Sequence, residues 1–277
     1  MEKQYTLSWM IVTLLIVFGF SACDKIEGPY GESATIVTNN RKVLLEDFTG
    51  HTCQNCPDAH REAQRLHDIY GDRLVILGIH WGFYARPQNA PYTADFRNAT
   101  DSTLATKFGI TLYPSGVVNR LYNSVTNRQY VLSWSEWETS VDSVLSRPAD
   151  ATLKLSNYFN ASDSMMTTTV RTSIVNDYAN PVGLAVYFTE DSIISPQKVG
   201  SIDSLNYVHR HMLRGAFNGA FGEIISSDVV GGDDYTNTYS AKLIPSTANV
   251  SQVYIVALLF DNITKQIIQV EEKKLVQ

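Results

Sequence analysis

The chain has few cysteines and no excess of positive charge. Among 277 residues there are three cysteines, and 22 lysines and arginines are outnumbered by 28 aspartates and glutamates, which gives a net charge of −6. Charges of both signs are interspersed along most of the sequence, so no basic face is available for a phosphate backbone. The apolar content, 44%, is that of a folded globular protein. We therefore expect a globular protein, with two domains as the better fit to its length, and no nucleic-acid partner.

The N-terminal apolar run is too short for a good permanent membrane span. It extends from Trp9 to Phe20, well below the roughly 20 residues that a helix needs to cross a bilayer. Lys3 lies in the short polar start before the run, and small residues follow it, which is the pattern of a secretory signal peptide. We predict that residues 1–22 are this signal peptide.

Cys23 comes directly after the predicted signal peptide. Phe-Ser-Ala and this cysteine together resemble a bacterial lipobox, with Phe20 in place of the usual aliphatic residue. The resemblance implies that Cys23 becomes the lipidated first residue and anchors the protein to a membrane; an incidental cysteine beside an ordinary cleavage site is the alternative. If Cys23 carries lipid, Cys53 and Cys56 have only each other or another molecule to bond, in a compartment where disulfides persist.

The pattern after Cys23 predicts a tether and then a strand, a helix and a strand. Residues 23–41 contain Gly, Pro, Ser and Asn without a sustained apolar period and are predicted to form a lipidated tether. Residues 42–50 have a buried-strand pattern, residues 58–71 have apolar positions at helical spacing, and residues 73–81 form a second apolar run. Such an order predicts a parallel βαβ unit.

The segment after this unit completes an α/β domain. Residues 82–100 are polar, aromatic and long for a plain connection, so we expect an active-site loop. A short Asp-capped helix is predicted over 101–110, a turn into a strand over 112–122 and an amphipathic helix over 134–146. An Arg-Pro pair stops the last helix, and we place the domain boundary there, so that the first domain spans 42–148.

From residue 151 onward the pattern changes to strands. Seven apolar runs are separated by turn signals, and the last two are joined by a short Asn-Ile-Thr link. This spacing predicts an antiparallel sandwich of immunoglobulin-like type over residues 149–277. The sandwich region has no cysteine at all, so its core must hold without an inter-sheet disulfide. The expected fold is an α/β domain followed by an all-β sandwich domain.

The stretch HTCQNCPDAH (51–60) places Cys53 and Cys56 three positions apart at the predicted helix start. A thiolate, and not a thiol, attacks a disulfide, and the N-terminus of a helix stabilises this anion. We predict that Cys53 lies at the helix start as the attacking sulfur, and that Cys56 lies one turn in, where it resolves a mixed disulfide. A permanent disulfide and a metal site are the alternatives.

The metal alternative uses the histidines near the two cysteines. Cys53, Cys56 and His60 form a C-x2-C-x3-H run, and His51 or His80 could complete a zinc or copper site. Helical spacing places Cys56 and His60 on one face but leaves His51 upstream in the loop. A redox pair is therefore the preferred interpretation, and no metal is assigned.

The other histidine pairs favour structural roles. His60 and His67 are seven residues apart and share one face of the predicted helix, where we expect them to be solvated or satisfied locally. His209 and His211 are predicted to alternate onto one face of a strand. They could bind a metal there, but an exposed polar face explains them better.

Residues 42–147 resemble a thioredoxin-fold domain. A strand, Cys-x-x-Cys at a helix start, a strand, a helix, a proline and a final helix follow one another in the family's order. The resemblance implies that Asp47, six residues before Cys53, is the buried acid that helps to move a proton off the resolving cysteine. Glu46 is the alternative, because side chains alternate between the faces of a strand and the sequence does not fix which acid points inward.

The thioredoxin resemblance also implies a substrate groove at Tyr113-Pro114. This dipeptide falls where the family has a cis-proline, whose loop lies against the disulfide and hydrogen-bonds extended peptides; X-Pro is the linkage for which cis is readily accessible. The chain departs from the family in having Gln-Asn between the cysteines, Thr52 in place of a tryptophan, and Pro57 after the second cysteine. The resemblance is therefore firmer for the fold than for any one redox activity.

Motifs across the whole chain resemble one lipoprotein family. The lipobox, GHTCQNCPDAH, LYPSGVVNR and YVHRHMLRGAFNG are similar to the twenty-eight-kilodalton outer-membrane lipoprotein family of Gram-negative anaerobes. The resemblance implies a protein of the cell envelope, anchored to the outer membrane by lipid.

The leading hypothesis is a lipid-anchored thiol-disulfide oxidoreductase of the cell envelope that uses no cofactor. Cys53 attacks or receives the substrate disulfide, Cys56 resolves it, Asp47 assists proton transfer, and Tyr113 and Pro114 shape the groove; the substrates are exported proteins or a redox partner. The rival hypothesis is a non-enzymatic outer-membrane lipoprotein, with a sandwich domain that binds a protein or glycan and a redox-inert, disulfide-closed scaffold.

Overall fold

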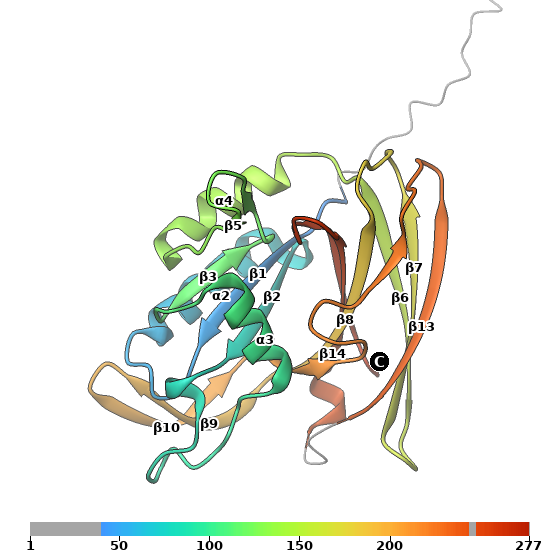
Figure 1. Ribbon diagram of the computed structural model, residues 1–277. Helices are drawn as coiled ribbons and strands as arrows, with labels where there is room; N and C mark the ends of the chain where they lie inside the picture. Colours follow the sequence, from blue (N-terminus) through green and yellow to red (C-terminus); the bar gives the residue numbers. More distant parts are fainter. Residues whose placement is uncertain (1–39, 244–247, 277) are drawn as a thin grey trace, which may run out of the picture. The chain divides into compact units, whose positions relative to one another are not determined.

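Figure 1 shows the computed structural model, which describes residues 40–243 and 248–276. The predicted signal peptide, the predicted lipidation site Cys23 and all but the end of the predicted tether lie outside these residues. Within the described ranges, no helix has the length and apolar character needed to cross a membrane.

The described chain is rich in β-strands and has few helices, as the sequence predicted in outline. The helices are α2 (Cys56–Tyr70), α3 (Ala99–Phe108) and α4 (Trp137–Leu145). The 3-10 turns are η2 (Gly71–Arg73), η3 (Phe83–Ala85), η4 (Trp134–Glu136) and η5 (Val250–Gln252). The strands are β1 (Val43–Thr49), β2 (Leu74–His80), β3 (Ser115–Val118), β4 (Tyr122–Asn123), β5 (Arg128–Gln129), β6 (Ala151–Asn160), β7 (Met165–Ile174), β8 (Val182–Glu190), β9 (Ile193–Val199), β10 (Ile202–His209), β11 (Met212–Ala216), β12 (Glu223–Ser226), β13 (Asp234–Lys242), β14 (Val253–Asp261) and β15 (Ile267–Lys274).

One large sheet contains strands from both halves of the chain. Its order is β15-β14-β8-β11-β2-β1-β3, and β12 pairs with β8. β1 and β2 are parallel over their whole length and α2 connects them, which confirms the predicted βαβ unit. β11 joins β2 at the pair Met212 and Gly78, so strands from residues 149–277 extend the sheet that residues 42–148 begin. The boundary at 148 stays a prediction, but the two parts share backbone hydrogen bonding.

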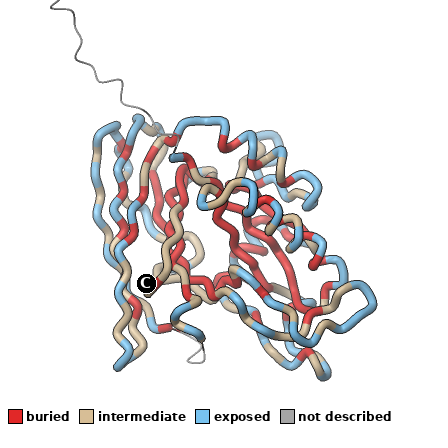
Figure 2. The backbone as a smooth tube through the Cα atoms, turned by 180° about the vertical axis from the view of Figure 1, so that it is seen from behind, coloured by how far each residue is buried: buried red, intermediate tan, exposed pale blue. Residues whose placement is uncertain are grey.

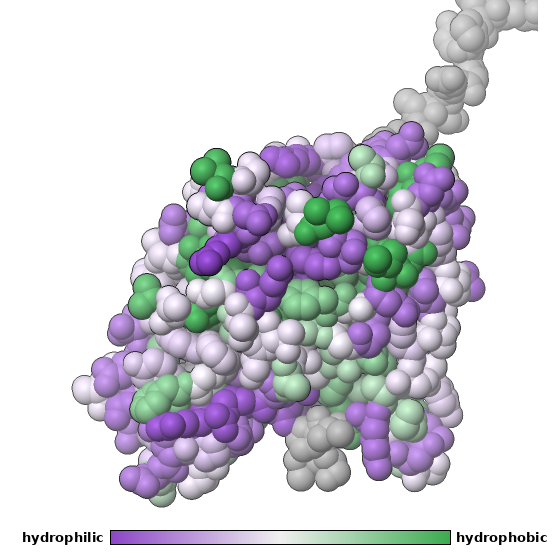
Figure 3. Space-filling view, viewed as in Figure 1, coloured by the Kyte–Doolittle hydropathy of each residue, from purple (hydrophilic) through white to green (hydrophobic). Residues whose placement is uncertain are grey.

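The two faces of β1 are covered by different helices. Leu45 packs with residues of α2 and α4 in one core, whereas Leu44 and Phe48 pack with residues of α3 in a second core. Because side chains alternate along a strand, Asp47 lies on the α2 face and Glu46 on the α3 face. Figure 2 shows the buried residues concentrated along these central strands. On the face drawn in Figure 3, strongly hydrophobic residues form small, separate patches among polar ones, as is normal for a globular protein.

Strands β8 and β14 are buried on both faces. Tyr187 and Leu258 belong to the core that contains α3, whereas Val186 and Leu259 pack against β6 and β7 in a third core. The antiparallel sheet β13-β7-β6 therefore lies over this part of the large sheet and forms a sandwich with it. Burial on both sides explains why these two strands are continuous apolar runs in sequence.

Residues 193–209 form a β-hairpin that the sequence pattern did not reveal. β9 and β10 pair with each other as a separate two-stranded sheet. The single strand predicted to carry both His209 and His211 is divided, because β10 ends at His209 and β11 begins at Met212. His211 has a φ of 50°, in the left-handed region, and turns the chain between the two strands. The prediction that His209 and His211 share one face of a strand is therefore wrong.

Candidate functional site

Cys53 and Cys56 are joined by a disulfide bond. Cys53 lies in the loop between β1 and α2 and is 4% exposed, whereas Cys56 is fully buried. The first cysteine is thus the more accessible of the two, which is compatible with its predicted role as the attacking sulfur. The surrounding chain nevertheless covers the bond almost completely.

The helix begins later than the sequence predicts. α2 starts at Cys56, with Asn55 as its N-cap, so Cys53 lies three residues before the helix and Cys56 is its first residue rather than one turn in. Pro57 explains the difference, because it has no N–H to donate to the carbonyl of Cys53 and its ring would clash with that carbonyl in a longer helix. The dipole effect falls off within the first turn. Its influence on Cys53 is therefore weaker than predicted.

Gln197 of β9 binds two backbone carbonyls of the loop, and the carbonyl of Cys53 is one that the late helix start leaves free. Its side chain is fully buried, and Nε2 donates to the carbonyl oxygens of Cys53 at 3.1 Å and of Gly50 at 3.3 Å. A buried carbonyl without a partner costs about 1–3 kcal/mol, so these bonds stabilise the loop in its observed conformation. The hairpin thereby supports the loop that holds the disulfide.

Two backbone hydrogen bonds also join the hairpin to this loop. The N–H of Lys198 donates to the carbonyl of His51 at 2.8 Å, and the N–H of Gly200 donates to the carbonyl of Gln54 at 2.9 Å. These bonds flank Cys53 on both sides in sequence. The hairpin is therefore fastened to the loop on both sides of the buried Cys53.

The two candidate acids lie in different environments. Glu46 is fully buried and forms a bidentate pair with Arg120, with Nη2 at 2.7 Å from Oε1 and Nε at 3.0 Å from Oε2. Asp47 is 3% exposed on the α2 face, and its Oδ1 makes no hydrogen bond within the described chain. Burial raises the pKa of Asp47 to about 8. Asp47 is thus the acid without a cation, although its role in proton transfer stays a prediction.

His60 connects this acid to the hairpin. Its Nε2 lies 2.8 Å from Thr49 Oγ1 and 3.7 Å from Asp47 Oδ2, and its Nδ1 lies 2.7 Å from the hydroxyl of Tyr207. Burial, followed by the nearby His209 and by Arg61, lowers the pKa of His60 to about 3. As expected, His60 has a hydrogen-bond partner nearby in the sequence, Thr49. The second partner of His60, Tyr207, lies on a strand far away in the sequence.

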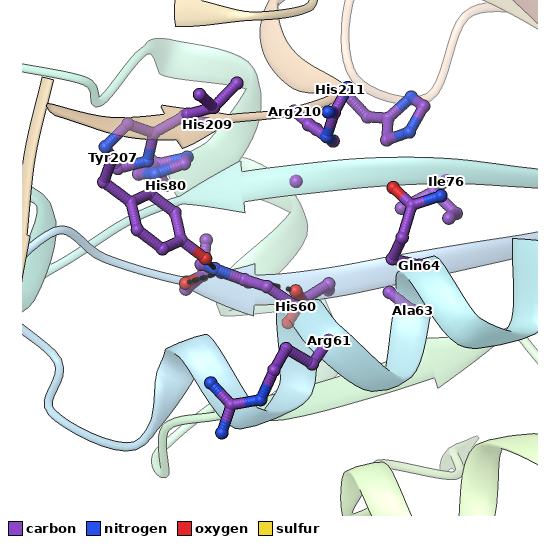
Figure 4. Close-up of a pocket in the computed structure, with 14 residues that line it drawn as sticks. His60, Arg61, Ala63, Gln64, Ile76, His80, Tyr207, His209, Arg210 and His211 are labelled. Atoms are coloured by element: carbon purple, nitrogen blue, oxygen red, sulfur yellow. Dashed lines mark hydrogen bonds and ion pairs between the residues drawn. The ribbon is translucent and has the colours of Figure 1, made fainter. Parts of the chain in front are cut away.

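A cavity of about 270 Å³ lies between α2, β2 and the segment from β10 to β11. Figure 4 shows the side chains of His60, His80, His209 and Tyr207 gathered at one end of it and those of Gln64 and His211 at the other. The residues around it are Asp47, Thr49, His60, Arg61, Ala63, Gln64, Ile76, Gly78, His80, Tyr207, Val208, His209, Arg210 and His211.

His80 and His209 are in ring contact at the end of the cavity that also holds His60 and Tyr207 (Figure 4). We call this the inner end of the cavity. Both are 2% exposed, and their ring centroids are 5.5 Å apart. Neither ring makes a well-formed hydrogen bond with another described residue. Burial lowers the pKa of His80 well below its usual range and that of His209 to about 4; nearby backbone groups oppose this only weakly. Both imidazoles are therefore neutral at pH 7.

The predicted substrate turn lies beside the end of β1. The Tyr113-Pro114 bond is cis, and the next residue, Ser115, pairs with Phe48. The hydroxyl of Tyr113 donates to the carbonyl of Trp81 at 3.0 Å. Burial is the main reason that the pKa of Tyr113 lies above its usual range. The turn thus lies near the loop that holds the disulfide, while substrate binding there stays a prediction.

The structure gives the metal alternative little support. Among residues 40–243 and 248–276, no three His, Cys, Asp or Glu side chains are grouped so that they could hold a metal ion. The two sulfurs are bonded to each other, and both ring nitrogens of His60 have hydrogen-bond partners. The oxidised site is therefore not a preformed metal centre.

Sequence reasoning missed the contribution of the hairpin. Gln197 and Tyr207 are separated from their partners by 144 and 147 positions, and the strand pattern gives no sign of which distant loop a hairpin will cover. An available signal was the concentration of histidines: six in the chain, in two groups at 51–80 and 209–211.

One family matches more than half of the chain. The sequence profile of the family described as outer membrane protein Omp28 matches residues 101–277. The match begins after Cys53 and Cys56, so it does not include the disulfide. No curated protein matches the chain.

Several solved structures are similar to this chain. HBP35 of Porphyromonas gingivalis is 18% identical with a TM-score of 0.65, over 85% of this chain and 75% of that chain. A structural-genomics protein from Agrobacterium tumefaciens is 13% identical with a TM-score of 0.50, over 86% and 96%. A domain of the outer membrane lipoprotein Omp28 from P. gingivalis is 23% identical with a TM-score of 0.31, over 46% and 88%. The first two likenesses concern the fold alone.

Proposed function

We propose that this chain, which belongs to the Omp28 family of outer membrane proteins, exchanges thiols and disulfides in the cell envelope through Cys53 and Cys56. One observation carries the proposal: the two cysteines form a disulfide directly before a helix, and the strand that leads to them carries the buried acid Asp47. We take residues 42–148 as a thioredoxin-like domain and residues 149–277 as an immunoglobulin-like sandwich that extends its sheet.

In the proposed reaction, a substrate thiolate attacks the sulfur of Cys53. The bond between the two cysteines breaks, and Cys56 leaves as a thiolate that takes up a proton. A second substrate thiolate then attacks the substrate sulfur of the mixed disulfide, which forms the substrate disulfide and releases Cys53 as a thiolate. Two electrons pass from the substrate dithiol to the protein. The reverse sequence reduces a substrate disulfide, and the reduction potentials of the two pairs set the direction.

Asp47 is proposed to exchange the proton that Cys56 gains or loses. Because burial raises the pKa of Asp47 to about 8, its carboxyl group is protonated at pH 7 and can supply a proton to a thiolate. His60 follows Cys56 by four residues in α2 and so shares its face. The 3.7 Å separation between His60 and Asp47 therefore places the acid beside the face of the helix that carries Cys56.

The proposed substrates are exported proteins or a partner that carries electrons, bound as extended chains beside Tyr113 and Pro114. Exposed apolar side chains lie beside this turn: Leu112, which precedes it, is 75% exposed, and Tyr84, whose ring contacts that of Tyr113, is 39% exposed. Lipid on Cys23 would hold the protein at the membrane, and no nucleic acid takes part.

Trapping of mixed disulfides tests the proposal. In cells that make the Cys56→Ser variant, Cys53 cannot be released by its neighbour, so we expect substrate proteins to stay bonded to it and to appear as reducible adducts on non-reducing gels. The Cys53→Ser variant is the matched control, because it keeps one cysteine of the pair and removes the attacking one. Equal adducts in both variants would overturn the assignment.

The near-complete burial of the disulfide favours one alternative, a scaffold closed by a permanent bond. In that case the family's role in the envelope would reside in the sandwich, which would bind a protein or glycan. The two candidates differ in thiol chemistry: a scaffold gives no adducts above the control, and its bond resists reduction for as long as the protein stays folded.

A further inference from the structure

The hairpin meets the rest of the α/β part along a line of histidines. Hydrogen bonds from Gln197, Lys198 and Gly200 hold its tip on the loop that contains the disulfide. Behind the tip, three ring contacts join β10 and His211, which precedes β11, to α2 and β2, with centroids between 5.5 and 5.9 Å apart. We call this boundary the histidine seam; it consists of His60 with Tyr207, His80 with His209, His67 with His211, and His51, whose carbonyl accepts from the tip.

The seam contains every histidine of the chain, six in all. Its innermost pair, His80 and His209, is buried without a well-formed hydrogen bond. Apolar side chains of similar size would therefore stabilise the fold at neutral pH about as well as these two histidines do. A proton on either ring would place a charge in a buried site beside a second imidazole, which strongly disfavours the closed arrangement. Opening would return the protonated rings to water.

The charges that face the inner end of the seam, at His60, His80 and His209, do not neutralise such protons. Arg61 of α2 and Arg210 after β10 are cationic and lower the pKa values of neighbouring histidines. Asp47 is the acid nearest the inner end, and its pKa of about 8 keeps it protonated below pH 7. Two acids at the margin of the seam favour protons on its outer histidines: Asp191, 3.7 Å from Arg210, on His211, and Asp95 on His51. The remaining groups are the pair of Lys198 with Asp203 at the tip and Tyr207, whose pKa burial raises to about 12.

We propose that the β9–β10 hairpin is a latch over the Cys53–Cys56 disulfide, and that it opens when the histidines of the seam take up protons. The latch gives the proposed redox function a regulator, since the sulfurs are covered at neutral pH and become accessible in acid. The latch itself requires only the disulfide and the hairpin, so it can be tested without a redox substrate.

The direction of the pH effect follows from the buried imidazoles. A histidine whose pKa is lowered in the closed form favours opening once the pH falls below about 6.5, the pKa of an exposed imidazole. Each such histidine raises the equilibrium constant for opening by up to about tenfold per pH unit, until the pH reaches its pKa in the closed form. His60, His80 and His209 each reach this regime between pH 7 and pH 5. Asp47 opposes them, because its raised pKa favours the closed form in acid. Three histidines favour opening and one carboxyl opposes it. Together they raise the equilibrium constant for opening of the hairpin by about 100-fold between pH 7 and pH 5.

Two measurements on the full chain test the latch. One is hydrogen exchange of residues 193–209, corrected for the intrinsic pH dependence of exchange, with β14 as the internal reference for global unfolding. The other is the rate at which a water-soluble phosphine reduces the disulfide, normalised to a model disulfide peptide at each pH. From pH 7 to pH 5 we expect both hairpin exchange and the normalised rate to rise at least about tenfold while β14 stays protected.

The double variant His80→Phe/His209→Phe removes the two innermost protonation sites and keeps ring-sized side chains. His60 alone then opposes Asp47, so we expect the acid-induced opening to be lost. His67→Gln, at the half-exposed margin of the seam, is the matched control and should keep most of it. Gln197→Ala is a second, independent variant that loosens the tip and should raise the reduction rate already at pH 7.

Several results would overturn the latch: a hairpin and a rate that do not change in acid, an acid response that survives in the double variant, loss of protection in β14 together with the hairpin, or an unchanged rate in Gln197→Ala. Failure of the redox function gives a different pattern, in which the hairpin opens in acid but Cys56→Ser traps no substrate even at pH 5, where the hairpin is open.

Discussion

Asp47 Oδ2 and His60 Nε2 lie 3.7 Å apart, yet the two side chains do not form a salt bridge at neutral pH. Burial raises the pKa of Asp47 to about 8 and lowers that of His60 to about 3. At pH 7 the acid therefore keeps its proton and the imidazole is neutral. The pair is a neutral acid and a neutral base enclosed beside the disulfide, and this state determines how the site responds to mutation and pH.

Replacement of Asp47 by Asn should stabilise the protein at high pH. The folded-state pKa of Asp47 is above its unfolded value near 4, so the penalty for burial is absent in acid and grows as the pH rises toward 8. We expect Asp47→Asn to raise the free energy of unfolding by about 3–5 kcal/mol at pH 8 and by about 1–2 kcal/mol at pH 5. Urea unfolding at the two pH values measures this difference, and equal effects at both would show that the carboxyl is ionised in the folded protein.

Replacement of Glu46 by Gln should destabilise the protein. Glu46 and Arg120 are both fully buried and doubly hydrogen-bonded, so Glu46→Gln leaves an uncompensated buried guanidinium. We expect a loss of about 3–5 kcal/mol in the free energy of unfolding. A double-mutant cycle with Arg120→Met provides the control: the double variant should lose less than the sum of the single variants. Simple additivity would contradict the pair.

The sequence predicted the local elements well and the long-range contacts poorly. The βαβ unit is confirmed because strand and helix periods differ clearly over residues 42–81. The sequence places the start of α2 at Cys53, three residues too early, because Pro57 is tolerated in a first helical turn but excludes a turn that begins at Cys53. The break at His211 has no turn signal in the sequence, since no Gly, Pro, Asn or Asp lies between His209 and Met212.

Only the part of the candidate site that is local in sequence was predicted. Cys53, Cys56 and Asp47 are close in sequence and lie in one continuous segment of strand, loop and helix, so local reasoning found them. Gln197, Tyr207 and His209 reach the site from a hairpin about 140 residues away, and a propensity argument does not specify which distant surface a hairpin covers. Only the gathering of all six histidines hinted at a shared environment.

Titration of Cys53 should reflect the late start of α2. Because the cysteine precedes the helix by three residues, we expect its pKa in the reduced protein to lie below the free value of about 8.5 but toward the upper end of the range for such motifs, at about 6.5–8. Alkylation rates of the reduced Cys56→Ser variant as a function of pH measure this value. A pKa at or above about 8.5 would remove the electrostatic basis of the redox assignment.

Tyr207 should anchor the hairpin through a single hydrogen bond. Its hydroxyl lies 2.7 Å from Nδ1 of His60, and Tyr207→Phe leaves that buried nitrogen without a partner while it keeps the ring contact. Loss of such a bond costs about 1 kcal/mol, so we expect the hydrogen exchange of residues 193–209 to rise by about fivefold at pH 7 with little change in β14. Tyr158→Phe is the matched control, because Tyr158 is 65% exposed on β6. If both variants exchange like the original protein, the bond between Tyr207 and His60 does not hold the hairpin closed, and the contacts at the tip must do so alone.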